Sequence, residues 1–137
     1  MRRLFSGPQP PPKHTVFILE DDVPIADVIG ELLEDEGYYV NVANTAEEAL
    51  KLLETVPMPD TFVVDYMLPD MNGRQFIESI RVRFGQRKLP PVLMLTASKE
   101  GEAIANALQL IDFMPKPFDN AELLEHIAKL VKRNVNK

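Results

Sequence analysis

The feature that most constrains the fold is a regular alternation between two kinds of segment. Short apolar runs, rich in β-branched residues, lie at about residues 14–20, 38–43, 61–65, 91–96 and 111–114. The segments that follow them have apolar residues every three or four positions, as a helix requires. These helical segments begin near residues 25, 45, 74, 101 and 119. The pattern predicts five strands that alternate with five helices.

Strands that alternate with helices form a parallel sheet with right-handed crossovers and helices on both faces. The run from Pro91 to Thr96 is apolar almost throughout, which is typical of a strand buried on both faces. We therefore predict an α/β fold, with a single doubly wound five-stranded parallel sheet and five helices. Residues 1–13, which contain four prolines, are expected to be a flexible Pro-rich N-terminal tail. Residues 14–133 would form the domain, and residues 134–137 a C-terminal tail.

The composition weighs against several kinds of function. The chain has no cysteine and only two histidines, so it lacks the ligands for a disulfide framework or a zinc site. Its net charge of −6 weighs against a direct nucleic-acid partner. No apolar run approaches the roughly 20 residues of a membrane helix, and the opening residues lack the apolar core of a secretory signal. We therefore expect a cytoplasmic protein without a membrane partner, in which any metal is a hard cation bound by oxygen.

Polar residues stand where the predicted strands end. Glu20 and Asp21 follow the first strand, and Asp65 ends the third. Thr96 ends the fourth strand, and Lys116 follows the fifth. Because the carboxyl ends of parallel strands meet at one edge of the sheet, these side chains are expected to lie together. Carboxylates that lie close together raise one another's pKa unless a cation compensates them, and oxygen ligands without His or Cys favour Mg²⁺.

In a phosphoryl transfer, each of these groups would have a chemical role. A carboxylate held by Mg²⁺ keeps one oxygen free to attack a phosphoryl group. The Lys116 ammonium would neutralise the phosphoryl oxygens, and the Thr96 hydroxyl would donate a hydrogen bond to them. Taken singly, the residues have plainer explanations, since Thr96 could merely end a strand and Lys116 could be solvated. Asp22, which stands two residues before Pro24, is assigned to capping the first helix rather than to the metal.

Four motifs carry a resemblance to a known family. The stretches ILEDDVP, DYMLPDMNG, LTAS and MPKPF occur in this order along the chain. With them, the segment from about Thr15 to Lys132 resembles the receiver domain of bacterial-type two-component response regulators. The resemblance implies a flavodoxin-like fold with strand order 2-1-3-4-5.

The resemblance also implies a role for each matching residue of the acidic cluster. Asp65 would be the phosphorylated aspartate. Mg²⁺ would be bound by Glu20, Asp21, Asp65 and the backbone carbonyl of Met67. In the relatives that the motifs resemble, this cation is the cofactor of phosphorylation.

A second group of residues would bind the phosphoryl group and respond to it. Lys116 would pair with it, Thr96 would donate a hydrogen bond to it, and Ala97 would be small enough to leave its pocket open. Phe113 would be the aromatic switch residue of the fifth strand, although it could equally be plain core. The peptide bond between Lys116 and Pro117 would be cis, which costs little before proline.

The implied function is that of a phosphoacceptor in signal transduction. A histidine kinase or a phosphotransfer protein would supply the phosphoryl group from a phosphohistidine. The phosphorylated domain would switch a surface that binds a downstream protein, with a homodimer as a further option. Such a domain is a signalling module rather than an enzyme, although it catalyses its own phosphorylation and dephosphorylation. The separation of Thr96 and Lys116 is shorter than usual in the family, which predicts a short or shifted fourth helix.

Two other functions compete with this interpretation. A receiver fold can serve as a docking module that is never phosphorylated, and such modules usually lose acceptor, metal or lysine residues. A hydrolase with an aspartate nucleophile would place a second carboxylate two residues after it as the general acid. This chain has Met67 at that position.

Overall fold

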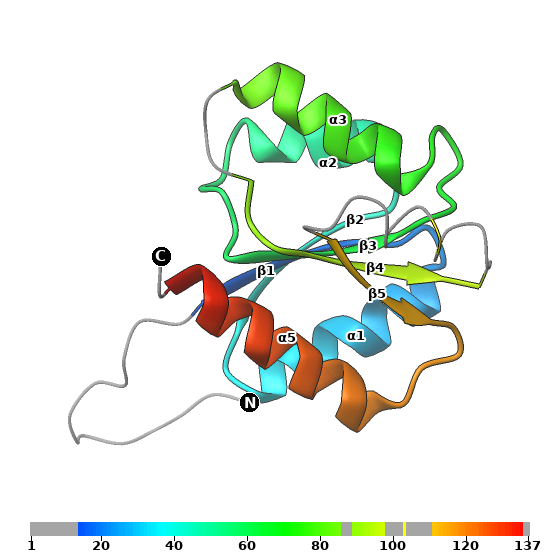
Figure 1. The fold of residues 1–137 in the computed structure, drawn as a ribbon, viewed down its shortest axis with the longest axis vertical. Helices are drawn as coiled ribbons and strands as arrows, with labels where there is room; N and C mark the ends of the chain where they lie inside the picture. The colour runs from blue at the N-terminus through cyan, green and yellow to red at the C-terminus, as the bar shows by residue number, and fades with distance from the viewer. Residues whose placement is uncertain (1–13, 86–88, 98–102, 104–110, 136–137) are drawn as a thin grey trace.

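The computed structural model describes residues 14–85, 89–97, 103 and 111–135. One parallel sheet of five strands, in the order β2-β1-β3-β4-β5, forms the centre of the molecule (Figure 1). The strands are β1 (Thr15–Leu19), β2 (Tyr39–Ala43), β3 (Thr61–Asp65), β4 (Val92–Thr96) and β5 (Ile111–Pro115). The helices are α1 (Val23–Asp35), α2 (Ala46–Leu53), α3 (Gly73–Phe84) and α5 (Asn120–Val135). The predicted fold class and the predicted strand order are therefore confirmed.

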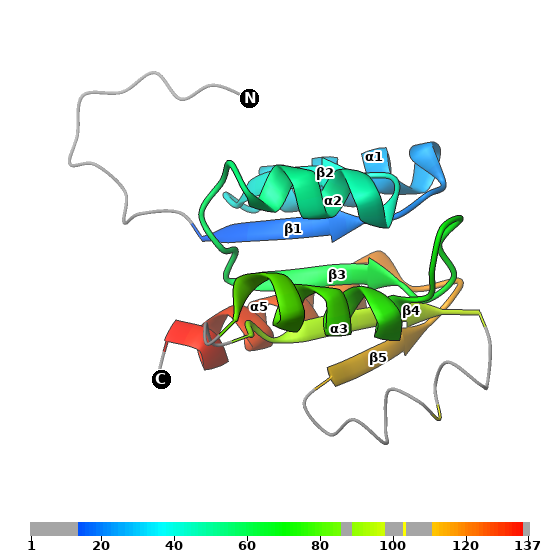
Figure 2. The same cartoon turned by 90° about the horizontal axis from the view of Figure 1, so that it is seen from above.

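Helices cover both faces of the sheet. The helices α2 and α3 lie on one face, and α1 and α5 lie on the other (Figures 1 and 2). Side chains of the inner strands alternate between two cores, so that Phe17 and Phe62 pack toward α2 and α3, whereas Ile18 and Val63 pack toward α1 and α5. All residues of β3 and β4 are buried, which is why these strands read as unbroken apolar runs.

The described part of the chain contains four helices rather than the five that the sequence predicts. The expected fourth helix, from about Gly101 to Leu108, falls almost entirely outside the described residues, as does the predicted tail over residues 1–13. The last helix, α5, extends to Val135. Within the ranges that the structure describes, no helix is both long and apolar enough to cross a membrane.

Side-chain caps fix the starts of the helices. The Asp22 carboxylate accepts a hydrogen bond of 3.1 Å from the Ile25 amide, which agrees with its assignment to capping the first helix. The Thr45 hydroxyl accepts one of 3.1 Å from the Glu48 amide at the start of α2. The Glu48 side chain reaches back to the amide of Asn44, one residue before the one that a capping box would use.

Candidate functional site

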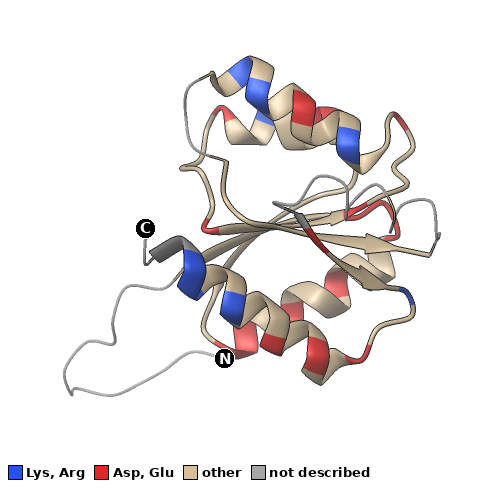
Figure 3. Cartoon of the chain, in the orientation of Figure 1, with Lys and Arg blue, Asp and Glu red and all other residues tan. Residues whose placement is uncertain are grey.

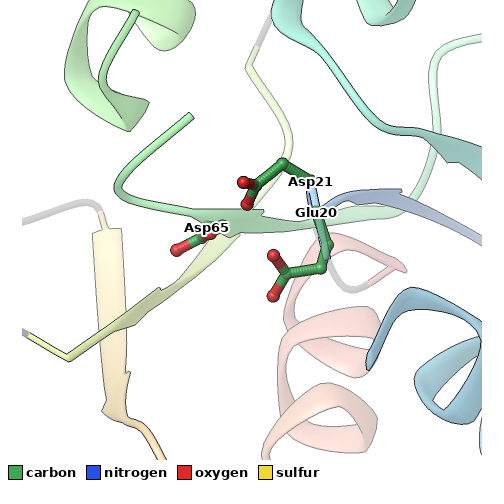
Figure 4. Close-up of side chains that lie close together, drawn as sticks. All are labelled: Glu20, Asp21 and Asp65. Atoms are coloured by element: carbon green, nitrogen blue, oxygen red, sulfur yellow. The ribbon is translucent and has the colours of Figure 1, made fainter. Parts of the chain in front are cut away.

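Three carboxylates meet at the carboxyl edge of the sheet. The pairing of Leu19 with Val64 in β1 and β3 places the next two residues, Glu20 and Asp65, side by side. One carboxylate oxygen each from Glu20, Asp21 and Asp65 lies within 4.8 Å of the others (Figure 4). Glu20 and Asp65 are buried, whereas Asp21 is exposed. Three oxygen ligands at this separation could hold one hard divalent cation.

Lys116 is the counter-charge of this cluster. Its ammonium lies 2.7 Å from Oε1 of Glu20 and 3.4 Å from Oδ2 of Asp65. Burial by itself lowers the pKa of Lys116, but the hydrogen bond to Glu20 and the charges of Asp65 and Glu20 outweigh it, so the pKa is raised. Lys116 therefore remains positively charged and contacts both buried carboxylates.

The charge of Lys116 does not prevent a rise in the pKa of Asp65. The pKa of Asp65 is raised from its ordinary value of 3.8 to about 7. The main cause is burial, and the hydrogen bond and negative charge of Glu20 add to it, while the charge of Lys116 opposes the rise. Asp65 therefore holds its proton unusually tightly unless a further cation joins the cluster.

Without a divalent cation, this raised pKa makes stability depend on pH. Folded Asp65 binds its proton more tightly than unfolded Asp65, so the free energy of unfolding should fall as the pH rises from about 4 to 7. We expect the Asp65→Asn variant not to show this fall. At pH 8 in EDTA, its free energy of unfolding should be about 2 kcal/mol higher than that of the parent. Urea unfolding of both proteins across this range measures the difference. A difference that does not grow with pH would contradict the prediction.

The remaining predicted site residues lie in or next to β4 and β5. Thr96 is buried at the end of β4, and its carbonyl accepts a hydrogen bond of 2.9 Å from the Lys116 amide. Ala97, the next residue, is exposed. Phe113 is half-buried and packs against the core between the sheet and the helices α2 and α3. The bond between Lys116 and Pro117 is cis.

Met67 lies on the loop between β3 and α3 and is 62% exposed. Its amide donates a hydrogen bond of 3.4 Å to Oδ1 of Asp65. The loop folds back sharply, because the Gly73 amide donates to the Tyr66 carbonyl at 2.7 Å. A β-carbon at Gly73 would lie 2.9 Å from Cε of Met94 and 3.3 Å from Cα of Tyr66, so a side chain there would force both neighbours to shift. The assignment of the Met67 carbonyl to a metal stays a prediction.

The structure adds Asp70 to the residues that shape the site. Its two carboxylate oxygens accept hydrogen bonds from the amides of Ala46 (3.2 Å) and Glu47 (3.0 Å), at the start of α2. Asp70 thereby fastens the loop that follows Asp65 to a neighbouring helix N-terminus, where negative charge is favourable. Sequence reasoning missed this contact, because nothing local relates Asp70 to a helix that begins 24 residues earlier.

Removing this contact should loosen the loop. We expect Asp70→Ala to lower the free energy of unfolding by about 1–2 kcal/mol, because two helix amides lose their acceptor. Urea unfolding measures the loss. Asp70→Asn keeps one oxygen acceptor and should lower the free energy of unfolding by less. Equal losses in the two variants would show that the hydrogen bonds to the helix amides do not stabilise the fold.

The fold recurs among solved structures. A CheY-like receiver domain from Methanospirillum hungatei superposes with a TM-score of 0.78 at 28% identity, over 91% of this chain and 98% of that one. The receiver domain of the Francisella response regulator 1452 gives a TM-score of 0.74 at 31% identity, over 88% and 98% of the two chains. These similarities identify a CheY-like α/β domain.

The sequence identifies the family. The sequence model of the response regulator receiver domain matches residues 16–128, and the chain belongs to this family. The transcriptional regulatory protein CpxR of Escherichia coli is 34% identical over 121 residues, which are 87% of this chain and 50% of CpxR. The phosphate regulon transcriptional regulatory protein PhoB of Escherichia coli is 32% identical over 120 residues, 86% of this chain and 52% of PhoB. The chain spans about half the length of these curated relatives.

Proposed function

We propose that this receiver domain accepts a phosphoryl group on Asp65 in a reaction that depends on Mg²⁺. The observation that carries the proposal is the meeting of three carboxylate oxygens within 4.8 Å, beside a lysine 3.4 Å from Asp65. A structural role alone would not need such a cluster, because burying like charges is costly. A phosphorylation site needs both its nucleophile and its cation.

The residues present fit a magnesium ion. Glu20, Asp21 and Asp65 offer only oxygen, and a bound cation would oppose the burial and the negative charge of Glu20 that raise the pKa of Asp65. When bound, the cation would keep Asp65 ionised and neutralise phosphoryl oxygens. We assign Glu20, Asp21, Asp65 and the Met67 carbonyl as its ligands.

In the proposed reaction, one oxygen of Asp65 attacks the phosphorus of a phosphohistidine. The new oxygen–phosphorus bond forms as the nitrogen–phosphorus bond breaks, and the imidazole leaves with the electron pair of that bond. Lys116 reaches Asp65 already, so a small shift away from Glu20 would let it pair with a phosphoryl oxygen. Thr96, at the end of the adjacent strand, would donate a hydrogen bond, and Ala97 would leave room for the phosphoryl group.

The proposed output is a change in a protein-binding surface. A phosphoryl group on Asp65 brings nearly two further negative charges beside Thr96 and Lys116. We propose that Thr96 and the half-buried Phe113 pass this change to the surface around β5 and α5. The phosphoryl donor would be a histidine kinase or a phosphotransfer protein, and the reaction would take place in the cytoplasm. The switched surface would bind a downstream protein or a second copy of the chain.

Intact mass spectrometry tests this function. The chain is incubated with acetyl phosphate in Mg²⁺ or in EDTA, and the product is then treated with neutral hydroxylamine, which cleaves acyl phosphates. We expect a gain of one phosphoryl group that requires Mg²⁺ and is removed by hydroxylamine. No gain in a folded protein would favour a docking module that is never phosphorylated.

A further inference from the structure

A groove outside the phosphorylation site runs between α1 and the edge strand β2. Its volume is about 270 Å³. Its floor is formed by Ala26, Gly30, Val40 and Val42, and its rim by Asp27, Glu31 and Glu34. The groove shares no residue with the carboxylate cluster, and it includes neither Lys116 nor the loop that follows Asp65.

The floor of the groove is apolar and partly open. Gly30 has no side chain to fill it, and a β-carbon there would meet only Cγ1 of Val40, at 4.0 Å. Val42 is 41% exposed although it lies in a strand of the sheet. Because β2 is the edge strand, no further strand of the described sheet covers this side. An apolar side chain placed here would gain burial.

The rim is acidic, and no lysine or arginine of the described residues compensates it. The helix α1 contains acidic residues but no lysine or arginine (Figure 3). Among the residues that the structure describes, none forms an ion pair with Asp27, Glu31 or Glu34. The groove therefore suits a segment that combines basic with apolar side chains.

Such a segment occurs in the same chain. Arg2 and Arg3 directly precede Leu4 and Phe5, and residues 1–13 contain no acidic residue. The two arginines match the acidic rim in charge, and the two apolar residues match the floor. These four residues lie outside the described part of the structure, so their pairing with the groove is inferred from chemistry and reach.

The segment between Phe5 and His14 is long enough to reach the groove. The carbonyl of His14 accepts a hydrogen bond of 2.9 Å from the amide of Tyr39, so the described part of the chain begins beside the first residue of β2. Val42 lies roughly 10 Å further along that strand. Phe5 and His14 are nine positions apart, a distance along the chain that spans up to about 28 Å in an extended proline-rich conformation. The covalent link also gives the tail a high effective concentration at the groove, so individually weak contacts suffice.

We propose that residues 2–5 dock in the groove between α1 and β2 of the same chain. Leu4 and Phe5 lie on the floor, and Arg2 and Arg3 pair with the acidic rim. The docked tail covers exposed apolar surface of an edge strand, the kind of surface that otherwise invites pairing with other chains. This interaction does not depend on phosphorylation of Asp65.

Paramagnetic relaxation tests the proposal in the full chain. The chain has no cysteine, so Ser6→Cys provides a single position for a nitroxide label. We expect the amide signals of Gly30, Val40 and Val42 to lose about half of their intensity or more, while Ile77 in α3, on the opposite face, keeps its intensity. Raising the salt concentration should reduce the loss, because ion pairs at the rim are screened.

Charge reversal provides the matched controls. Glu31→Lys, or Arg2→Glu with Arg3→Glu, should restore the lost signals, whereas Glu78→Lys on α3 should not. A loss that is equal on both faces, or that survives Glu31→Lys, would overturn the proposal. In a mixture of ¹⁵N-labelled chains without nitroxide and unlabelled chains with nitroxide, a loss at the groove would assign it to a second copy and refute docking within one chain.

Discussion

Asp65→Asn is expected to abolish phosphoryl uptake. The amide of asparagine is not nucleophilic, so uptake from acetyl phosphate in Mg²⁺ should fall by at least about 100-fold. The fold should survive, because the variant removes a charge from a cluster in which the pKa of Asp65 is already raised to about 7. The loss would therefore report chemistry rather than unfolding.

Asp60→Asn is the matched control for this experiment. Asp60 directly precedes the same strand at its other end, where its carboxylate accepts a hydrogen bond of 2.8 Å from the Thr15 amide. An asparagine there keeps an oxygen acceptor, so its uptake should equal that of the parent in intact mass. Undiminished uptake by Asp65→Asn would show that another carboxylate is the acceptor, with Asp21, the exposed member of the cluster, as the first candidate.

Lys116→Met should impair both stability and phosphoryl uptake. Glu20 is only 1% exposed and would lose its 2.7 Å partner, so the free energy of unfolding in EDTA should fall by about 3 kcal/mol. Mg²⁺ should recover part of this loss, because a divalent cation compensates the same carboxylates. Uptake in Mg²⁺ should fall about 100-fold, the usual effect of removing one group that stabilises developing charge.

Lys116→Arg and Lys129→Met separate the causes. Arginine keeps the positive charge and should keep most of the stability, whereas its different shape should lower the uptake. Lys129 is exposed on α5 and, among the residues that the structure describes, pairs with the exposed Glu125, so its replacement should change neither quantity. Urea unfolding and the rate of phosphoryl gain are the two measurements. A stable Lys116→Met variant in EDTA would refute the role of Lys116 as the counter-charge of Glu20.

The sequence predicted the position of the site better than its internal contacts. The acidic residues at the ends of β1 and β3 were expected to meet, and the described carboxylates do lie within 4.8 Å. The sequence assigned Glu20 to a metal and Lys116 to a phosphoryl group. The structure joins these two side chains directly at 2.7 Å, across 96 residues of sequence, a contact that no local pattern could indicate.

Hydrophobic periodicity and the ends of the apolar runs determined the layers, the parallel sheet and the edge at which the polar residues collect. These follow from the sequence because burial on two faces imposes a pattern that repeats within a few residues. Only the tertiary structure decided that Asp70 fastens its loop to α2, that Lys116 pairs with Glu20, and that an apolar groove with an acidic rim remains beside β2. Such contacts depend on how distant elements pack, since a separation of a few ångströms decides whether two charges meet.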